Sequence, residues 1–513
     1  MEPQQRPRPR QSPVRSRRPT AGPEPARSPG PGPNSGPGPG PGTHPNPSPG
    51  PPPSGSRDDH SRGGGAADNG SRQRTGRRSR RDLLAAAGGL TASLAAAPLL
   101  GACAPERGAA RTARAARSGR VQLTFACAAF AGGSMTVQQL VDGYNSAQSR
   151  YHVRVRNLPP PSSSTECHQQ LTQLLARKDG AIDVFAQDIV WVAELARAGW
   201  VQPLDSVVSR EQRRAFFPGV VRACTYRNRL VALPWYVDAG GLYYRTDLLH
   251  AIGRTPPRTW HELVDVATEL RHRTRVPMGF LWQAKQAEVL ICNLVEFVAS
   301  NGGHIVDPGG KVTLDSPECV EAVQYMRDLV RRYRVSPTEV FSWDEEPSRR
   351  PFSAGDAGMM RHWAYAYGVS QDKAQSDVVG KVDIAPLPRF PGGTSASCLG
   401  GYQLGVSAAS RHKDGAVDFL HWLTGTRAQL TFATDFGNAP ARSSVYGQRR
   451  LAARQPGMVK LKDAFDHGVP RPVTPDYPRA SLALQSAVSR ALVDGNVRET
   501  LRSARRDLEA IVR

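Results

Sequence analysis

From about residue 121 onward, short apolar runs alternate with segments whose apolar residues recur every three to four positions. The runs have the β-branched and aromatic content of strands, and the segments between them have the periodicity of helices that bury one face. The first strands expected are residues 121–126, 152–157 and 182–186, and the helices between them are residues 136–147 and 167–178. This alternation predicts an α/β fold in which a largely parallel sheet is covered by helices on both faces.

The stretch LPWYVDAGGLYYRTDLL, residues 233–249, interrupts this pattern. Pro234 stiffens the backbone before two aromatic residues, and the pair Gly240 and Gly241 loosens it before the next strand. A second stretch of this kind, APLPRFPGG at residues 385–393, precedes another predicted strand, YQLGVS. Two such crossings between sheets predict two hinged lobes that face a cleft. Ligands of such sheets bind beyond the carboxyl ends of the strands.

The N-terminal part of the chain has a different composition. Residues 6–78 are mainly Pro, Gly, Ser and Arg, so they cannot bury enough apolar surface to fold, and we expect them to be disordered. Next, Arg80 and Arg81 precede the weakly apolar run LLAAAGGLTASLAAAPLL, which ends in Leu-Gly-Ala-Cys103. This segment resembles a twin-arginine export signal joined to a bacterial lipobox. The alternative is an ordinary helix or a membrane span, although Pro98 breaks the run.

Export of this kind would fix the location of the protein. Cleavage before Cys103 and acylation of its sulfur would leave the chain tethered by lipid to the extracellular face of the cytoplasmic membrane.

The sequence has 67 Lys and Arg against 45 Asp and Glu, of which residues 1–103 hold 15 and 6, so residues 104–513 carry a net charge of +13. These charges form no stripe with aromatic residues, so nucleic-acid binding is not expected. Attraction to anionic lipid or wall polymer explains them more simply.

Cysteines after residue 103 number six, which is an even count: Cys127, Cys167, Cys224, Cys292, Cys319 and Cys398. An even count in an exported chain allows disulfides, with fifteen possible connectivities. No CxxC pair or histidine partner lies at ligand spacing, so the sequence predicts no structural metal.

Several motifs in order resemble one known family. They include AIDVFAQDIVWVAELARAGWVQPLD, LPWYVDAGGLYYRTDLLHAIG followed by PPRTWHEL, FSAGDAGMMRHWAYAY, and KVDIAPLPRFPGGTSASCLGGYQLGVSAAS. The series resembles the extracellular solute-binding proteins of carbohydrate ABC importers and spans about Val121 to Tyr446. Within that family GGYQLGVS and PARSSVY resemble the trehalose/maltose-binding branch.

The resemblance implies a fold and a function. The fold is the two-lobed periplasmic-binding-protein fold of type II, and the function is capture of a disaccharide or oligosaccharide for delivery to an ABC-transporter permease. It implies a monomer that is not an enzyme and holds no cofactor. The expected organisation is an extension at 1–78, an export signal at 79–103, a linker at 104–119, first-lobe segments at 120–234 and 391–440, and second-lobe segments at 235–390 and 441–513.

A disaccharide presents flat C–H faces and a rim of hydroxyls, which aromatic rings and polar side chains satisfy respectively. By the resemblance, Trp363 and Tyr365 form a stacking platform, and Tyr236 and Tyr402 lie beside the opening between the lobes. Hydroxyl or ring-oxygen partners expected on the same ground are Ser134, Asp188, Asp238, Glu288, Gly401 through its N–H, and Arg442 through its guanidinium. The family often has Trp where this chain has Tyr402, so the identity of the sugar stays open.

Each role has a structural alternative. Trp363 could be a core residue, and Trp235 is expected to pack rather than to bind. Asp188 could cap the helix that follows it, and Glu288 could simply suit the start of a helix. A carbohydrate-active enzyme is a further alternative, because Asp188 with Asp238 or Glu288 could form a carboxylate pair across a glycosidic bond. Two other functions remain as alternatives: a structural lipoprotein of the cell wall, and a binding protein for a solute other than a sugar.

Overall fold

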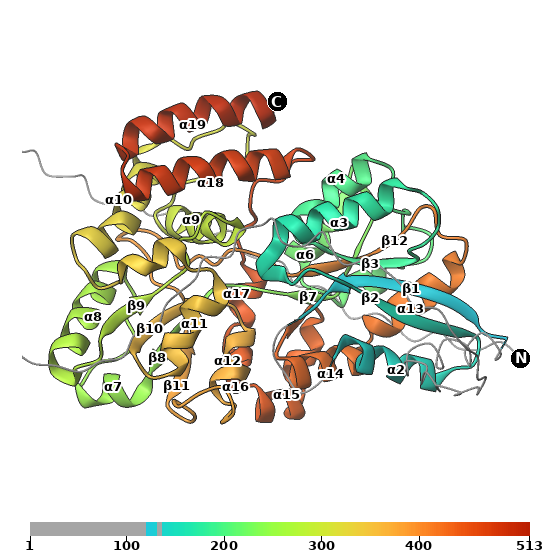
Figure 1. The fold of residues 1–513 in the computed structure, drawn as a ribbon, viewed down its shortest axis with the longest axis horizontal. Coiled ribbons are helices and arrows are strands. Elements are labelled where there is room, and N and C mark those ends of the chain that lie inside the picture. Colours follow the sequence, from blue (N-terminus) through green and yellow to red (C-terminus); the bar gives the residue numbers. More distant parts are fainter. Residues whose placement is uncertain (1–118, 131–135, 513) are drawn as a thin grey trace, which may run out of the picture. The chain divides into compact units, whose positions relative to one another are not determined.

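The computed structural model describes residues 119–130 and 136–512. The predicted extension, export signal and linker, with Arg80, Arg81 and Cys103, lie outside the described residues, and so does Ser134. The described chain forms two lobes, each built on its own sheet (Figure 1). Helices and strands alternate in both, so the predicted α/β class is confirmed.

The sheet of the first lobe has five strands in the order β2-β1-β3-β12-β6. Their bounds are β1 (Val121–Ala128), β2 (Tyr151–Leu158), β3 (Val184–Asp188), β6 (Leu233–Pro234) and β12 (Tyr402–Val406). β1 is parallel to β2 and β3, whereas β12 is antiparallel to β3 and β6. β1, β2, β3 and β6 therefore run in one direction, so this sheet is largely parallel as predicted, and among its five strands only the returning strand β12 runs against the others. β12 begins with Tyr402 paired to Asp188, the last residue of β3, so the chain re-enters at the carboxyl edge and must run the other way.

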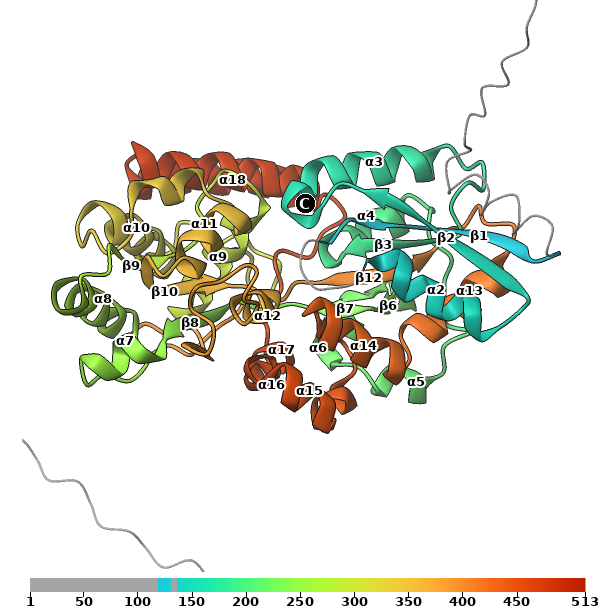
Figure 2. The same ribbon diagram turned by 60° about the horizontal axis from the view of Figure 1, so that its bottom comes forward.

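Helices cover both faces of this sheet. Their bounds are α2 (Val137–Ala147), α3 (Ser164–Ala176), α4 (Val192–Arg197), α5 (Arg210–Arg214), α6 (Pro218–Ala223), α13 (Lys413–Leu423) and α14 (Thr426–Phe436). In both views α3 and α4 lie on one side of the sheet and α2 and α14 on the other (Figures 1 and 2). A capping box starts α2, because Thr136 and Gln139 each accept a hydrogen bond from the other's backbone N–H.

The second lobe has a four-stranded mixed sheet in the order β11-β8-β10-β9. Its strands are β8 (Gly241–Arg245), β9 (Met278–Leu281), β10 (Ala357–His362) and β11 (Val382–Ala385). Its helices are α7 (Thr246–Ala251), α8 (Trp260–Thr274), α9 (Glu288–Ser300), α10 (Pro317–Arg331), α11 (Glu345–Ser353), α12 (Tyr365–Ser370), α18 (Tyr477–Val493) and α19 (Val497–Val512). Alternate residues of the strands serve two apolar cores: Leu242 and Met359 face the core beneath α8 to α10, whereas Tyr243 and Met360 join the core that continues from the first lobe.

Three chain segments cross between the lobes. The first crossing contains β7 (Tyr236–Val237), which pairs with β13 (Ala439–Pro440) after α14, and its Asp238 pairs with Gly400 of the second crossing. The third crossing was not singled out in the sequence: residues 467–476 lead from the small helices α15 (Arg449–Arg454), α16 (Pro456–Lys460) and α17 (Lys462–Asp466) into α18. There Val469 donates its N–H to Ser397 and accepts from the N–H of Leu399 (both 2.8 Å). The third crossing is thus bonded to the second.

Glycine is required where two crossings touch. Gly401 has a φ of +104°, and a methyl group added there would lie 2.3 Å from the carbonyl oxygen of Tyr236. Gly240 has another reason, because an added methyl would lie 2.2 Å from Glu296 Oε1. Both glycines permit a close approach of backbone to a neighbouring group, which a side chain would prevent.

All six cysteines of the described chain are buried free thiols. The disulfides that their even number allowed are therefore not formed. Among residues 119–130 and 136–512, no helix is long and apolar enough to cross a membrane. The same part of the chain contains no group of three or more His, Cys, Asp or Glu that could hold a metal ion.

Candidate ligand-binding site

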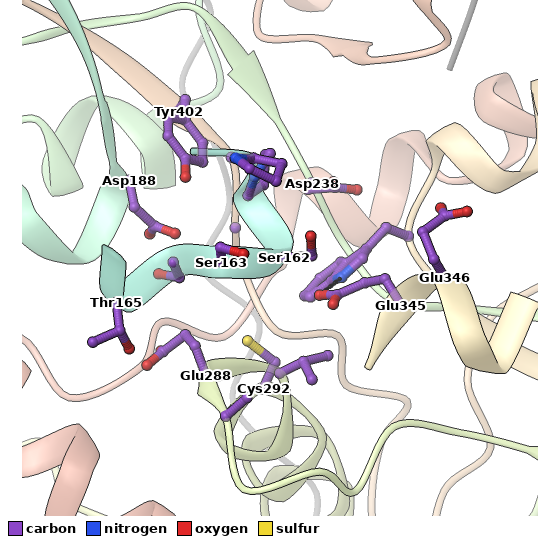
Figure 3. A pocket seen from close by; sticks show the side chains of 18 of the residues that line it. Ser162, Ser163, Thr165, Asp188, Asp238, Glu288, Cys292, Glu345, Glu346 and Tyr402 are labelled. Atoms are coloured by element: carbon purple, nitrogen blue, oxygen red, sulfur yellow. Dashed lines mark hydrogen bonds between the residues drawn. The ribbon is translucent and has the colours of Figure 1, made fainter. Parts of the chain in front are cut away.

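A cavity of about 300 Å³ lies where the lobes and the crossings meet (Figure 3). Its wall includes Phe130, residues 160–166 and Asp188 from the first lobe; residues 285–289, Cys292, Glu345, Glu346, Trp363, Tyr365 and Gln485 from the second; and Tyr236, Asp238, residues 400–402, Asn438 and Arg471 from the crossings and strand ends. The volume is within the range of small-molecule sites. A ligand in it would contact both lobes at once.

Trp363 is held in place by charge on two sides. The guanidinium of Arg361 lies 3.9 Å from the centre of its ring, a cation–π contact. The indole Nε1 donates to Glu345 Oε1 at 3.2 Å. Only 8% of Trp363 is exposed, so it is both a core residue and part of the cavity wall. The two interpretations from sequence therefore do not exclude each other.

Arg361 is itself part of a buried ion pair. Its Nε and Nη2 donate to the two oxygens of Glu296 at 2.8 and 2.6 Å, and both side chains are 1% exposed. Glu296 also accepts the backbone N–H of Cys398 at 3.1 Å, and Arg361 donates to Gln283 at 3.3 Å. These bonds fix β10, α9 and the second crossing relative to the ring of Trp363.

Tyr236 and Tyr402 form a stacked pair at the wall. Their ring centres are 5.8 Å apart and their planes differ by 8°. Phe130 lies edge-on to both rings. Trp235, by contrast, is fully buried and stacks on Phe432 outside the cavity, so it packs in the core as the sequence suggested.

Arg471 joins two of the carboxylates in the wall. Its Nη2 donates to Asp188 Oδ1 at 3.0 Å and its Nη1 donates to Glu288 Oε1 at 2.6 Å. Asp188 Oδ1 also accepts the N–H of Val190 at 3.2 Å, so the predicted cap is present too. Within the described residues Asp188 Oδ2 makes no hydrogen bond and remains available to a ligand.

Glu288 is occupied by protein partners. Besides Arg471, the hydroxyls of Tyr477 and Ser481 donate to its two oxygens. Although Glu288 lines the cavity, its carboxylate has fewer positions left for a ligand than Asp188 has.

Asp238 presents an acceptor beside Trp363. Its Oδ1 accepts the N–H of Ala364 at 3.0 Å and that of Ala239 at 3.2 Å, while Oδ2 makes no hydrogen bond within the described chain. Burial raises the pKa of this carboxyl to about 7, although the bond from Ala364 and the charge of Arg361 lower it. The neighbouring charge of Glu345 adds to the rise.

The comparison with known proteins assigns the chain to a family. The sequence profile described as bacterial extracellular solute-binding protein matches residues 132–430, more than half of the chain. The chain belongs to this family. A probable ABC transporter-binding protein of Deinococcus radiodurans is 34% identical over 385 residues, which cover 73% of this chain and 90% of the relative.

Proteins that are similar to this chain differ in what their names say they bind. Maltose-bound MalE3 of T. maritima is 34% identical, covers 76% of this chain with 99% of its own, and superposes with a TM-score of 0.71. A mannitol-binding protein of Pseudomonas aeruginosa is 26% identical over 301 residues, 57% of this chain and 69% of the relative. The two-lobed fold predicted from sequence is confirmed by these structural neighbours.

Most of the predicted site residues lie at the cavity of this solute-binding protein. They are Asp188, Tyr236, Asp238, Glu288, Trp363, Tyr365, Gly401 and Tyr402. Arg442 is not among the lining residues: its Nε donates to the carbonyl of Thr424 at 2.6 Å, and its guanidinium lies 4.9 Å from the ring centre of Phe216. The arginine that lines the cavity is Arg471 instead.

Sequence reasoning also missed Glu345 and Glu346 at the start of α11. Burial raises the pKa of Glu345, although its bond from Trp363 opposes the rise. Burial acts in the same sense on Glu346, but its ion pair with Arg349 outweighs it and lowers the pKa. Tyr365 donates to Glu346 at 3.0 Å. Only the run of three acids, Asp344 to Glu346, at the start of a helix could have pointed to them, and such runs are common on exposed helix starts.

The raised pKa of Asp238 predicts a pH dependence of stability without ligand. An unfolded Asp has a pKa of about 3.9, so between there and about 7 the folded state holds more protons. The stability from this group is complete below pH ~3.9 and is lost as the pH rises through about 7. Asp238→Asn should therefore flatten the fall in melting temperature between pH 5 and 7.5, measured by differential scanning fluorimetry.

Asp205→Asn is the control for this measurement. Burial tends to raise the pKa of Asp205, but ion pairs with Arg229 and Arg213 outweigh burial and lower it. This carboxyl is therefore ionised throughout that pH range in both the folded and the unfolded state. Its substitution should leave the slope unchanged. An Asp238→Asn profile parallel to that of the wild type would contradict the assignment.

Proposed function

We propose that the protein is a sugar receptor of an ABC importer, which captures a disaccharide or oligosaccharide between its lobes and delivers it to the permease. The observation that carries the proposal is the composition of the cavity wall. Aromatic rings suit the C–H faces of pyranose rings, and carboxylate oxygens with no other partner suit hydroxyl donors. Trp363 supplies a ring, and Asp188 and Asp238 supply one such oxygen each, from different parts of the fold.

The acceptors are held in place by a buried donor. Arg471 lines the cavity with a side chain that is 2% exposed, and its Nη atoms donate to Asp188 and Glu288. We infer that Arg471 orients these carboxylates toward a ligand rather than contacting the ligand itself.

A compact, uncharged, α-linked disaccharide of the trehalose or maltose kind is the proposed ligand. The similarity to MalE3 with maltose bound supports this class. The protein is further proposed to be a monomer without a cofactor.

Binding rather than hydrolysis is favoured by the state of the carboxylates. Asp188 and Glu288 share Arg471, and Glu288 accepts three hydrogen bonds from the protein. A general acid needs a carboxyl group that is free to give its proton to the leaving oxygen. This argues against the pair of Asp188 and Glu288, whereas Asp238, with a pKa raised to about 7, has an oxygen without a partner in the described part of the chain. We expect bound disaccharide to be recovered unchanged after incubation, which would exclude the pair of Asp188 and Asp238 as well.

The ligand class is tested by calorimetric titration with trehalose, maltose, sucrose, cellobiose and longer maltodextrins. An α-linked disaccharide should bind at least tenfold tighter than cellobiose, because an acceptor left unpaired by the wrong geometry costs ~1 to 3 kcal/mol. Trp363→Ala should weaken binding by ~1 kcal/mol or more through lost contact with the sugar face.

Trp422→Ala is the matched control, because Trp422 packs against Tyr144 in the first lobe, away from the cavity. Its affinity should equal that of the wild type. A preference for cellobiose would overturn the assignment to trehalose or maltose. Tightest binding to a peptide, a polyamine or a metal chelate would overturn the assignment to sugars altogether. Release of monosaccharide during the titration would indicate an enzyme.

We also propose export by the twin-arginine route and a lipid anchor at Cys103, on the extracellular face of the cytoplasmic membrane. The proposal rests on Arg80, Arg81 and the Leu-Gly-Ala-Cys103 sequence. Wild-type protein should require detergent for release from membranes, whereas Cys103→Ser should give an uncleaved or unlipidated form. Equal release of both proteins without detergent would refute the anchor.

A further inference from the structure

The third crossing carries two arginine–carboxylate contacts with the first lobe. One is in the cavity, where Arg471 meets Asp188 at the end of β3. The other is at the surface, where both Nη atoms of Arg197, in α4, donate to Asp476 at 2.7 and 2.9 Å. Because residues 467–476 lead into α18 of the second lobe, each contact joins the two lobes directly.

The two contacts differ in burial. The side chain of Arg471 is 2% exposed and that of Asp188 is 13% exposed, against 46% for Arg197 and 26% for Asp476. Exposed pairs contribute little because water and salt screen them. Contacts between buried charges are screened much less by water and salt. The contact of Arg471 is therefore the one able to hold the lobes together.

Most hydrogen bonds around Arg471 are made within the second lobe. Glu288 binds Arg471 and also Tyr477 and Ser481 of α18, so these four groups belong to the second lobe and move as one. Only the bond to Asp188 reaches the first lobe. Opening of the lobes would break that single bond and leave the others intact.

The same bond determines how Asp188 faces a ligand. With Oδ1 occupied by Arg471 and by the N–H of Val190, the carboxylate is fixed and offers Oδ2 to the cavity. A ligand hydroxyl and the guanidinium can then bind Asp188 at the same time. Charge-assisted bonds of this type are among the stronger ones in proteins.

We propose that Arg471 is a positioning residue that couples ligand binding to lobe closure, by linking Asp188 of the first lobe to Glu288 of the second. The inference rests on the proposed function, because closure matters for retention of a captured ligand. The contact forms only when the lobes meet, so its loss should accelerate release of the ligand more than it slows capture.

The test uses full-length protein and maltose, followed by stopped-flow tryptophan fluorescence. Arg471→Gln should increase the dissociation rate constant at least tenfold and change the association rate constant less than threefold. Arg197→Gln removes the exposed contact of the same crossing and touches no cavity residue, so both rate constants should stay within twofold of the wild type.

Arg471→Lys separates positioning from charge compensation. Lysine restores the positive charge, and with it the melting temperature, but a single ammonium cannot reproduce the two-pronged geometry, so dissociation should remain fast. A dissociation rate constant of Arg471→Lys within twofold of that of the wild type would overturn the proposal. This test holds even if Arg471→Gln does not fold.

Absence of sugar binding can be told apart from absence of the coupling through Arg471. If no sugar of the panel bound the wild type, the proposed function would fall, and X-ray scattering of the ligand-free proteins would still test the link. Arg471 joining Asp188 to Glu288 without a ligand should keep part of the ligand-free population closed. Arg471→Gln or, if it is unfolded, Arg471→Lys should then have a larger radius of gyration than the wild type. An equal radius would refute the coupling.

Discussion

The buried ion pair between Arg361 and Glu296 is the constraint on which the site depends. A guanidinium that is 1% exposed is tolerated only if its bonds are complete, and here Glu296 takes two of them and Gln283 another. The pair explains why Gly240 must lack a side chain, since any methyl group there would strike Glu296. It also holds the backbone of Cys398 and the ring of Trp363. One interaction thus aligns the two crossings and the aromatic wall.

The carboxylates in the cavity wall fall into two groups with different roles. Glu288 and Glu346 are bound to arginines and mainly organise the wall. Asp188 and Asp238 each use one oxygen for the protein and keep the other toward the cavity. A polar ligand without charge suits such a wall, because its hydroxyls can donate to carboxylate oxygens without bringing a new charge into a buried place.

Much of this arrangement could be predicted from the sequence. The strand at residues 121–126 and the helix at 136–147 lie within two residues of β1 and α2, because local periodicity and the cap at Thr136 define them. The direction of β12 could not be read in this way, since it depends on where the chain returns from the other lobe. The sequence around Arg442 and Arg471 does not show which of them lines the cavity. Tertiary packing places Arg442 against Phe216 and Arg471 at the cavity.

We propose that a sugar is held between two lobes that close on it. A ligand that contacts both lobes favours the closed form, so small-angle X-ray scattering of the full-length protein with and without saturating maltose tests this closure. We expect a smaller radius of gyration in the presence of maltose. An unchanged radius at a concentration shown by calorimetry to saturate the protein would contradict it.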